Sequence, residues 1–101
     1  MFTKDGRAII NGHVVPCAEI KVLRILVQLN GGAIVPTIAL RMDKEFSDAS
    51  LYTLLMRLSN RELVIREEVF PEVAGRPVRR VKWTACEEVI DFFVNSTEQS
   101  K

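Results

Sequence analysis

Basic side chains gather in one short segment in the last third of the chain. Residues 76 to 82 contain four cations and no acid, namely Arg76, Arg79, Arg80 and Lys82. The following residues, 83 to 101, contain four acids and one lysine. Guanidinium and ammonium groups bind phosphates and carboxylates through charge-assisted hydrogen bonds. Because the whole chain carries a net charge of only +1, this segregation predicts a local anion-binding surface and excludes a uniformly basic coat.

An alternative interpretation of the same segment stays open. Lysine and arginine on an exposed strand edge also discourage edge-to-edge aggregation, and that role needs no ligand. In addition, Glu67 and Glu68 lie on the preceding stretch, where they can pair with Arg79 and Arg80. Such ion pairs would reduce the charge that is available to an external anion.

A second candidate surface lies on a predicted helix that starts after Ser47. Serine is a favoured N-cap, so we expect this helix to run from Asp48 to about Arg61. Its core-facing positions share helical spacing, and they are Leu51, Leu55, Leu58 and position 62. Tyr52 stands beside this apolar stripe, so we expect it in the core as well.

The opposite face of that helix is small, polar and basic. It carries Ser50, Arg57 and Arg61, flanked by Ser47, Thr53 and Leu54. Short side chains let a helix approach the edges of bases closely, and an arginine there can contact a phosphate or a guanine. The alternative is an ordinary solvated helix face. The candidate nucleic-acid contacts on this helix are therefore Ser47, Ser50, Thr53, Leu54 and Arg57.

Residues for catalysis or metal binding are scarce in this sequence. The chain has one histidine, His13, and two cysteines, Cys17 and Cys86, which lie far apart. No nucleophile is paired with a base, and no Cys/His cluster has metal-ligand spacing. There is also no glycine-rich loop of the kind that cradles phosphates. We therefore expect a binding module with no enzymatic activity, no cofactor and no metal.

Length and composition indicate one small intracellular domain. With 101 residues, of which 48% are apolar, the chain can form a single core. No apolar stretch approaches the roughly 20 residues that span a bilayer, and the first six residues lack the apolar run of a signal peptide. Two widely separated cysteines form no disulfide framework. We therefore expect a reduced, cytoplasmic protein without a membrane partner.

The elements that must position these surfaces begin with a hairpin. Residues 8 to 10 and 13 to 15 flank Asn11-Gly12, the strongest two-residue hairpin signal, and an irregular arm is the alternative. Pro16 suits the first turn of a helix that continues to about Asn30. This helix is apolar around most of its circumference, so we expect it to be buried on more than one side.

The remaining predicted elements are a short strand, two helices, two strands and a last helix. They are a short strand at 33–35, a helix at 37–42, the helix at 48–61, strands at 63–70 and 78–83, and a last helix ending near Asn95. Thr84 and Glu87 match a capping box at the start of that last helix. The expected divisions are an N-terminal hairpin or arm at 1–16, a domain at 17–95 and a flexible tail at 96–101.

This order of elements predicts an α+β, mostly α fold, a winged helix-turn-helix. In such a domain the second turn-linked helix enters the major groove of DNA and the hairpin, or wing, reaches phosphates. The helix at 47–61 is then the recognition helix, and the basic segment at 66–82 is the wing.

Particular residues resemble the PadR-like transcriptional regulators. The run from Ser47 to Val64 resembles their recognition helix, with a Leu-Tyr pair, leucines at helical spacing and a final Leu-Val. Gly75-Arg76-Pro77, followed by a basic strand ending in Trp-Thr, resembles their wing. The resemblance covers about residues 20 to 92, and Ile38 to Met42 is similar to the family's second helix.

The resemblance implies a regulator of transcription that binds double-stranded DNA, with repression as the expected role. The sequence departs from the family at Val35-Pro36-Thr37, where a Gly-Tyr pair is usual, and at Glu62, where glycine is common. A MarR-like or other small repressor is an alternative within the same fold. A winged-helix protein–protein adaptor is the alternative from another class. The sequence does not identify an operator or a small-molecule effector.

We also expect a homodimer, because the apolar surplus exceeds what one small core needs. Phe92 and Phe93 are adjacent and point about 100° apart on a helix. An apolar patch left in water marks an interface. The candidate interface residues are Ile25, Val89, Phe92 and Phe93, and the alternative is a monomer whose core absorbs both phenylalanines.

Overall fold

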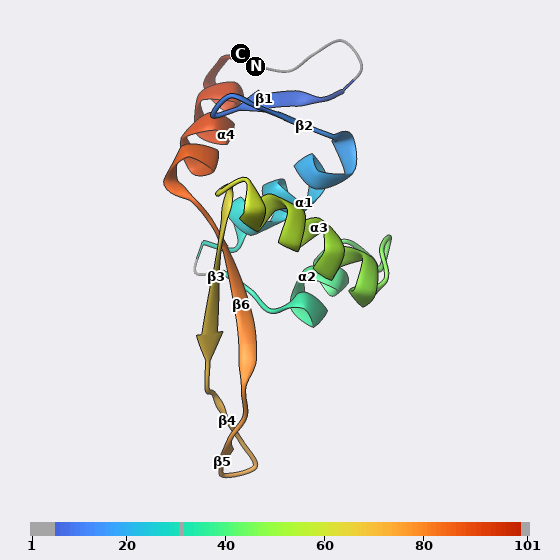
Figure 1. Cartoon of the computed structure of the whole chain (residues 1–101), viewed down its shortest axis with the longest axis vertical. Helices are drawn as coiled ribbons and strands as arrows, with labels where there is room; N and C mark the ends of the chain where they lie inside the picture. The colour runs from blue at the N-terminus through green and yellow to red at the C-terminus, as the bar shows by residue number, and fades with distance from the viewer. Residues whose placement is uncertain (1–5, 31, 100–101) are drawn as a thin grey trace.

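The computed structural model describes residues 6–30 and 32–99, and the side chains of 96–99 are left aside. Its α+β architecture confirms the predicted class, with helices grouped around the base of a long antiparallel ribbon (Figure 1). The elements are β1 (Ala8–Ile10), β2 (His13–Val15), α1 (Cys17–Gln28), α2 (Val35–Arg41), α3 (Asp48–Asn60), β3 (Val64–Val69), β4 (Glu72–Val73), β5 (Arg76–Pro77), β6 (Arg80–Ala85) and α4 (Glu87–Gln99). The ribbon lengthens the molecule to 48 Å, against 25 and 24 Å in the other directions.

The N-terminal hairpin is present, which decides against the irregular arm. β1 and β2 pair antiparallel, with Ile10 opposite His13. Asn11 and Gly12 have φ angles of 51° and 82°, the left-handed conformation that a tight two-residue hairpin requires. Ala8 and Val15 are fully buried, so this hairpin covers one end of the core.

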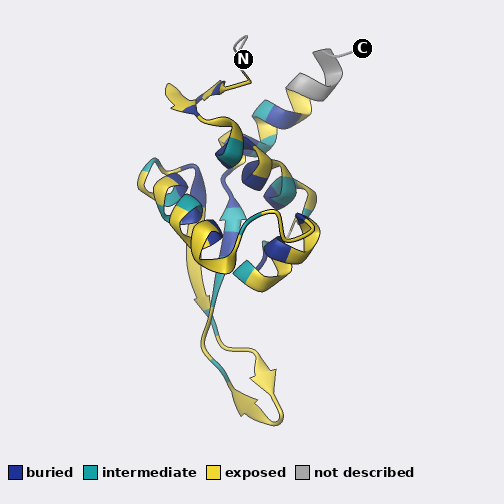
Figure 2. Cartoon of the chain, turned by 90° about the vertical axis from the view of Figure 1, so that its right-hand side faces the viewer, coloured by how far each residue is buried: buried dark blue, intermediate teal, exposed yellow. Residues whose placement is uncertain are grey.

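The first helix lies at the centre of the core, as its apolar circumference predicts. α1 contacts α2, α3, α4 and β6. Pro16 stands at its N-cap, and Val22, Leu23 and Leu26 are buried. Figure 2 shows buried residues concentrated where the helices meet the base of the ribbon, while the ribbon itself is exposed. Among the described residues, no helix combines the length and apolarity that crossing a membrane requires.

The third helix begins as predicted and ends slightly earlier. The Ser47 Oγ accepts a hydrogen bond from the Ser50 N–H at 3.1 Å, which confirms the N-cap. The leucines at 51, 55 and 58 are fully buried. The prediction that position 62 also faces the core is wrong, because Glu62 is exposed and has a φ of 60°.

The physical reason is a Schellman motif at the end of α3. The Leu63 N–H donates to the Leu58 carbonyl at 2.9 Å, and the Glu62 N–H donates to the Ser59 carbonyl at 3.0 Å. This motif places Glu62 at the left-handed position that glycine usually fills. Leu63, which is fully buried, takes the core position instead.

The ribbon, called the wing below, consists of β3–β6. β3 and β6 pair antiparallel from Val64 opposite Ala85 to Val69 opposite Arg80, and β4 pairs with β5 near the tip. Ala74 and Gly75 turn the tip with φ angles of 53° and 80°. These bonds confirm the predicted long hairpin.

The base of the wing is held by a third backbone segment. Ala33 and Trp83 exchange two backbone hydrogen bonds of 3.0 and 2.8 Å, so Ala33 pairs with the free edge of β6. Gly32 has a φ of 84°, and a Cβ there would lie 2.4 Å from Thr84 Oγ1 and 2.9 Å from the Trp83 carbonyl oxygen. Only glycine fits this approach without displacing β6.

The predicted capping box at the start of the last helix is wrong. Thr84 and Ala85 continue β6, so Cys86 is the residue that precedes the first helical residue of α4. Pairing with Val64 and Ile65 across the wing outweighs the local capping preference of Thr84. α4 then extends to Gln99, beyond the predicted end near Asn95.

One buried ion pair joins α3 to α1. Glu19 is 1% exposed, and its Oε1 accepts a hydrogen bond from Arg61 Nη1 at 3.1 Å. Arg61 is the C-cap of α3, so the pair joins the first turn of α1 to the end of α3. Burial raises the pKa of Glu19 above its ordinary value of 4.5, although Arg61 and Arg57 act in the opposite direction.

Replacing the partners of this ion pair should have unequal effects. A raised folded-state pKa means that the folded chain takes up a proton before the unfolded chain does, so this group adds stability as the pH falls toward 4.5. Glu19→Gln should remove that pH-dependent gain. Arg61→Ala leaves a buried carboxylate without its partner and should cost about 2 kcal/mol or more at neutral pH.

Urea unfolding between pH 4 and 8 measures both effects. The free energy of unfolding of Glu19→Gln should stay close to that of the unsubstituted chain at neutral pH, because the neutral amide is cheaper to bury. An equal loss for Glu19→Gln and Arg61→Ala would contradict the assignment of the cost to the unpaired carboxylate.

Candidate nucleic-acid interface

The outer face of α3 presents the predicted contacts to solvent. Ser47, Ser50, Thr53 and Arg57 are exposed, and Leu54 is half-buried. The hydroxyls on this face make hydrogen bonds within the chain: Ser47 Oγ donates to Ser50 Oγ at 3.0 Å, and Thr53 Oγ1 donates to the Ala49 carbonyl at 3.1 Å. A shallow pocket of about 300 Å³ lies on this face, lined by Ala18, Phe46, Ser50, Thr53, Leu54 and Arg57.

The prediction that Tyr52 lies in the core is wrong. Its side chain is 44% exposed, and its ring contacts Trp83 edge-to-face with centroids 5.9 Å apart. One residue along an α-helix rotates the side chain by about 100°, which carries Tyr52 from the stripe of Leu51 to the flank of the helix. Tyr52 therefore lies on the side of α3 that faces the wing, whereas Ser50 lies on the opposite flank.

Two of the four predicted wing cations are paired with acids on the neighbouring strand. Arg79 Nη2 lies 2.5 Å from Glu68 Oε1, and Lys82 Nζ lies 3.5 Å from Glu67 Oε1. The sequence anticipates the Arg79 pair but assigns the other one to Arg80. The register explains the difference, because Glu67 stands directly opposite Lys82.

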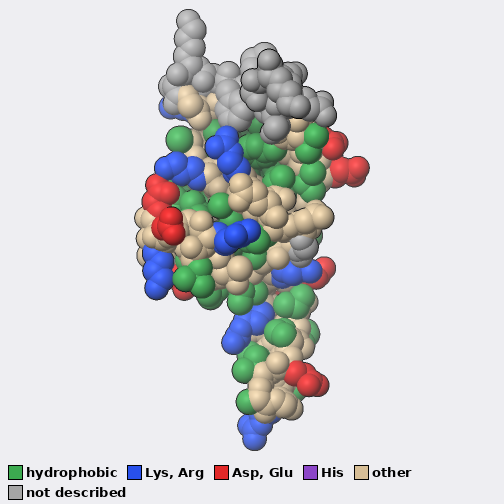
Figure 3. Space-filling model, turned by 180° about the vertical axis from the view of Figure 1, so that it is seen from behind, with side chains coloured by type: hydrophobic (Ala, Val, Ile, Leu, Met, Phe, Trp, Pro, Cys, Tyr) green, Lys and Arg blue, Asp and Glu red, His purple; other side chains and the backbone are tan. Residues whose placement is uncertain are grey.

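Arg76 and Arg80 are the predicted wing contacts that keep their charge available. Arg80 is exposed and donates to the backbone carbonyl of Arg79 at 3.1 Å, and among the described residues it forms no ion pair with a carboxylate. Arg76 is exposed near the wing tip, and it forms no ion pair within the described residues. Figure 3 shows Lys and Arg side chains distributed along the wing to its tip, with acidic side chains between them.

Arg66 is a further wing cation that the sequence analysis does not single out. Its guanidinium carbon lies 5.9 Å from the centroid of the Trp83 ring, a cation–π distance. Arg66 stands directly opposite Trp83 in the β3–β6 register. The pairing of Arg66 with Trp83 across the two strands would have identified Arg66 as a candidate. That pairing cannot be predicted from the sequence, because it depends on the length of the loop between the strands.

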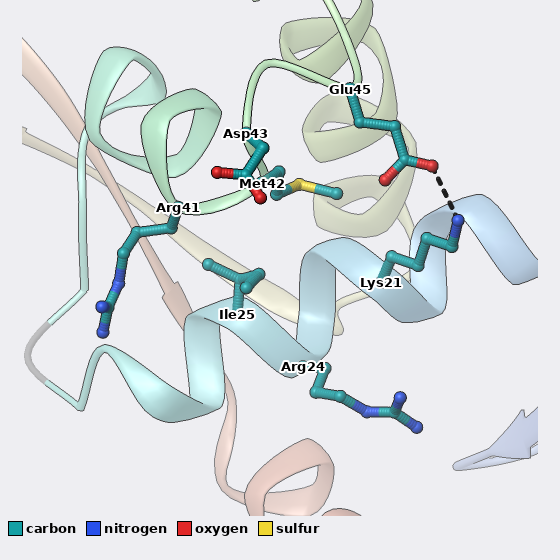
Figure 4. Close-up of a pocket in the computed structure, with 7 residues that line it drawn as sticks. All are labelled: Lys21, Arg24, Ile25, Arg41, Met42, Asp43 and Glu45. Atoms are coloured by element: carbon teal, nitrogen blue, oxygen red, sulfur yellow. Dashed lines mark hydrogen bonds and ion pairs between the residues drawn. The ribbon is translucent and has the colours of Figure 1, made fainter.

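Another pocket on the helical body is lined by three cations, Lys21, Arg24 and Arg41, which do not converge on one point. This pocket of about 270 Å³ lies beside α1 and the turn after α2, where Lys21 Nζ and Glu45 Oε1 form an ion pair of 2.7 Å. Figure 4 shows the guanidinium groups of Arg24 and Arg41 pointing in different directions. Arg24 instead lies over the Phe93 ring at 5.6 Å. The lining cations of this pocket therefore do not converge on a common ligand position.

The described part of the chain contains no cluster of metal ligands, and its two cysteines are free thiols. No group of three or more His, Cys, Asp and Glu residues there can hold a metal ion. Cys17 is an exposed free thiol, and Cys86 is a buried one whose pKa is raised by burial. A raised pKa keeps a thiol protonated and unreactive at neutral pH.

The predicted interface residues separate into two pairs. Val89 is fully buried and Phe93 is 8% exposed, so both belong to the core of the single chain. Ile25 and Phe92 are only partly buried. The Phe92 and Phe93 rings stand edge-to-face with centroids 5.2 Å apart, so the core absorbs one phenylalanine fully and the other in part.

Comparison with known proteins gives a likeness of fold. No family model and no curated protein matches the sequence. A PadR family transcription regulator from hypervirulent Clostridium difficile superposes with a TM-score of 0.57 and 19% identity, over 79% of this chain and 84% of that one. A mutant of Lactococcus lactis ZitR gives the same TM-score and identity, over 97% of this chain and 66% of that one. The described chain therefore has the winged-helix fold of PadR-like regulators.

Proposed function

We propose that this protein is a cytoplasmic, sequence-specific regulator of transcription that binds double-stranded DNA and acts as a repressor. The observation that carries the proposal is the placement of two surfaces on one core. The exposed face of α3 and the extended wing project from the same core. In this account α3 reads base edges and the wing anchors the protein to phosphates.

The dimensions and side chains of α3 suit a major groove. That groove is about 12 Å wide and admits one α-helix. Ser50 and Thr53 are short, so they allow close approach, and Arg57 is long enough to reach a guanine or a phosphate. The buried leucines of the same helix hold this face in place against α1.

The four predicted wing cations are not equally available to bind phosphates. Arg76 and Arg80 face solvent without a carboxylate partner in the described structure, so they can contact phosphates without first breaking an ion pair. Arg79 and Lys82 must first leave Glu68 and Glu67. Exposed ion pairs of this kind are worth about 0–1 kcal/mol, so a phosphate can displace them.

The likeness of fold supports the regulatory role. One neighbour is described as a PadR family transcription regulator. The same arrangement of helices and wing here provides the surfaces that such a role needs.

We further infer that two copies pair, which would present two α3 helices to half-sites about 34 Å apart. The support is the apolar surface beside α1 and α4. Ile25 and Phe92 are partly exposed, and Val94 is 48% exposed. A groove of about 240 Å³ lies next to them, lined by Arg24, Val27, Gln28, Phe93 and Val94.

A protein–protein adaptor is the second candidate function, and the wing tip favours it. Phe70 is 62% exposed and Val73 is 49% exposed. Large apolar side chains in water mark surfaces that bind protein partners. The acids Glu67 and Glu68 on the same wing also oppose binding to a polyanion.

The division of labour between wing and helix gives a direct test of DNA binding. Arg76→Ala or Arg80→Ala should weaken binding to all duplexes by the same factor and lower the slope of log affinity against log salt by about one. Arg57→Ala or Thr53→Val should instead change the preferred sequence. Fluorescence anisotropy with a duplex selected from a random pool, and with its scrambled version, measures both.

Glu68→Gln is the matched control for this experiment. It releases Arg79 without removing a cation, so it should raise the affinity for both duplexes and steepen the salt dependence. Equal losses from wing and helix variants on both duplexes would refute the division of labour. Failure of the unsubstituted protein to bind any duplex at low salt would refute the DNA-binding function and favour the adaptor.

Pairing of two copies is tested by a charge placed on the apolar surface. Val94→Glu should convert a dimer to a monomer and weaken operator binding, because a buried carboxylate opposes association. Val73→Glu is the control for the mass measurement alone, since its exposure is similar but it lies on the wing, where an added carboxylate also opposes DNA binding. Sedimentation velocity at micromolar concentration gives the masses, and a monomeric mass for the unsubstituted protein with and without operator DNA would contradict the dimer.

A further inference from the structure

The junction between α3 and the wing brings together two side chains that are not among the predicted DNA contacts. Tyr52 from α3 and Arg66 from β3 contact the same ring, that of Trp83, at 5.9 Å in each case. Trp83 itself is fully buried. Tyr52 and Arg66 are both exposed, so they form the solvent-facing side of this cluster.

Arg66 is a preorganised anion-binding group, because it is unpaired among the described residues and its side chain is restricted by the Trp83 ring. Within the described residues it makes no ion pair, unlike Arg79 and Lys82 further along the wing. Its stacking on an indole limits the rotamers of a long side chain, so less conformational entropy is lost when an anion binds. Its guanidinium presents several N–H donors, which suit the oxygens of a phosphate.

Tyr52 adds a hydroxyl on a ring that contacts the same indole. The edge-to-face contact with Trp83 fixes the plane of its ring, with an interplanar angle of 82°. Its hydroxyl can donate a hydrogen bond to an anionic oxygen, and tyrosine side chains contact phosphates in this way in protein–DNA interfaces.

The geometry of duplex DNA identifies the anion. A sugar–phosphate backbone separates the major groove from the neighbouring minor groove. If α3 occupies the first groove and the wing reaches toward the second, the residues that join these elements must face that backbone. Tyr52 and Arg66 stand at this joint.

We propose that Tyr52 and Arg66 form a binding site for a backbone phosphate of duplex DNA at the junction of α3 and the wing. The site rests on the proposed DNA-binding function and deepens it. It fixes the angle between helix and wing on the duplex, because one phosphate is held by a residue from each element.

The test compares Arg66 with a second arginine in the same geometry. Arg24 also lies over an aromatic ring, that of Phe93 at 5.6 Å, but it lies between α1 and α4. Arg66→Ala should weaken duplex binding about tenfold and lower the salt slope by about one. On a duplex with a single half-site, to which pairing of two copies does not contribute, Arg24→Ala should change the affinity less than twofold.

Three further variants distinguish a direct contact with the phosphate from a loss of folding stability. Arg66→Gln keeps the aliphatic stem against Trp83 and should lose affinity to nearly the same extent as Arg66→Ala. Arg66→Lys should keep the salt slope but bind several-fold more weakly, because an ammonium group lacks the planar fork. Tyr52→Phe should lose several-fold in affinity, and thermal unfolding of each variant should match the unsubstituted protein.

The outcomes distinguish this site from the function on which it rests. If the unsubstituted protein binds duplex and Arg66→Ala and Arg66→Gln behave like Arg24→Ala, the junction site is wrong while DNA binding stands. If the unsubstituted protein binds no duplex at low salt, the DNA-binding function is wrong and the site is wrong with it.

Discussion

The position of the wing depends on the burial of Trp83. Its backbone exchanges hydrogen bonds with Ala33 on one edge of β6, and its ring packs beneath Tyr52 of α3. Burying an indole contributes about 3–5 kcal/mol relative to alanine. Within the described residues its Nε1 is the one buried side-chain polar atom without a hydrogen-bond partner, which costs about 1–3 kcal/mol. The balance favours the buried ring, so Trp83 anchors the base of the wing to the helical body.

A second, polar constraint holds the C-terminal end of α3. The buried carboxylate of Glu19 binds Arg61 at the C-cap of α3, and Leu63 closes the Schellman motif that directs the chain into β3. The N-terminal end is set by the Ser47 cap. Because both ends are fixed, the face with Arg57 has a single orientation relative to the wing.

The sequence predicts features that depend on neighbours along the chain and misses those that depend on distant partners. The Ser47 cap and the buried leucines follow from local spacing, and the structure confirms them. Burial of Glu19 could not be predicted, since its partner is 42 positions away. Tyr52 is placed by the ring of Trp83, and Thr84 joins a strand because its cross-strand partners outweigh its capping preference.

The chain has a single tryptophan, so its indole N–H gives one signal that reports directly on the junction. The most direct test of DNA binding through α3 and the wing is a two-dimensional ¹⁵N–¹H titration of the protein with duplex DNA. The account predicts that the indole signal of Trp83 and the backbone amides of residues 47–57 and 64–85 shift together, while those of residues 87–95 stay in place. Shifts confined to α1 and α4, with an unchanged indole signal, would contradict it.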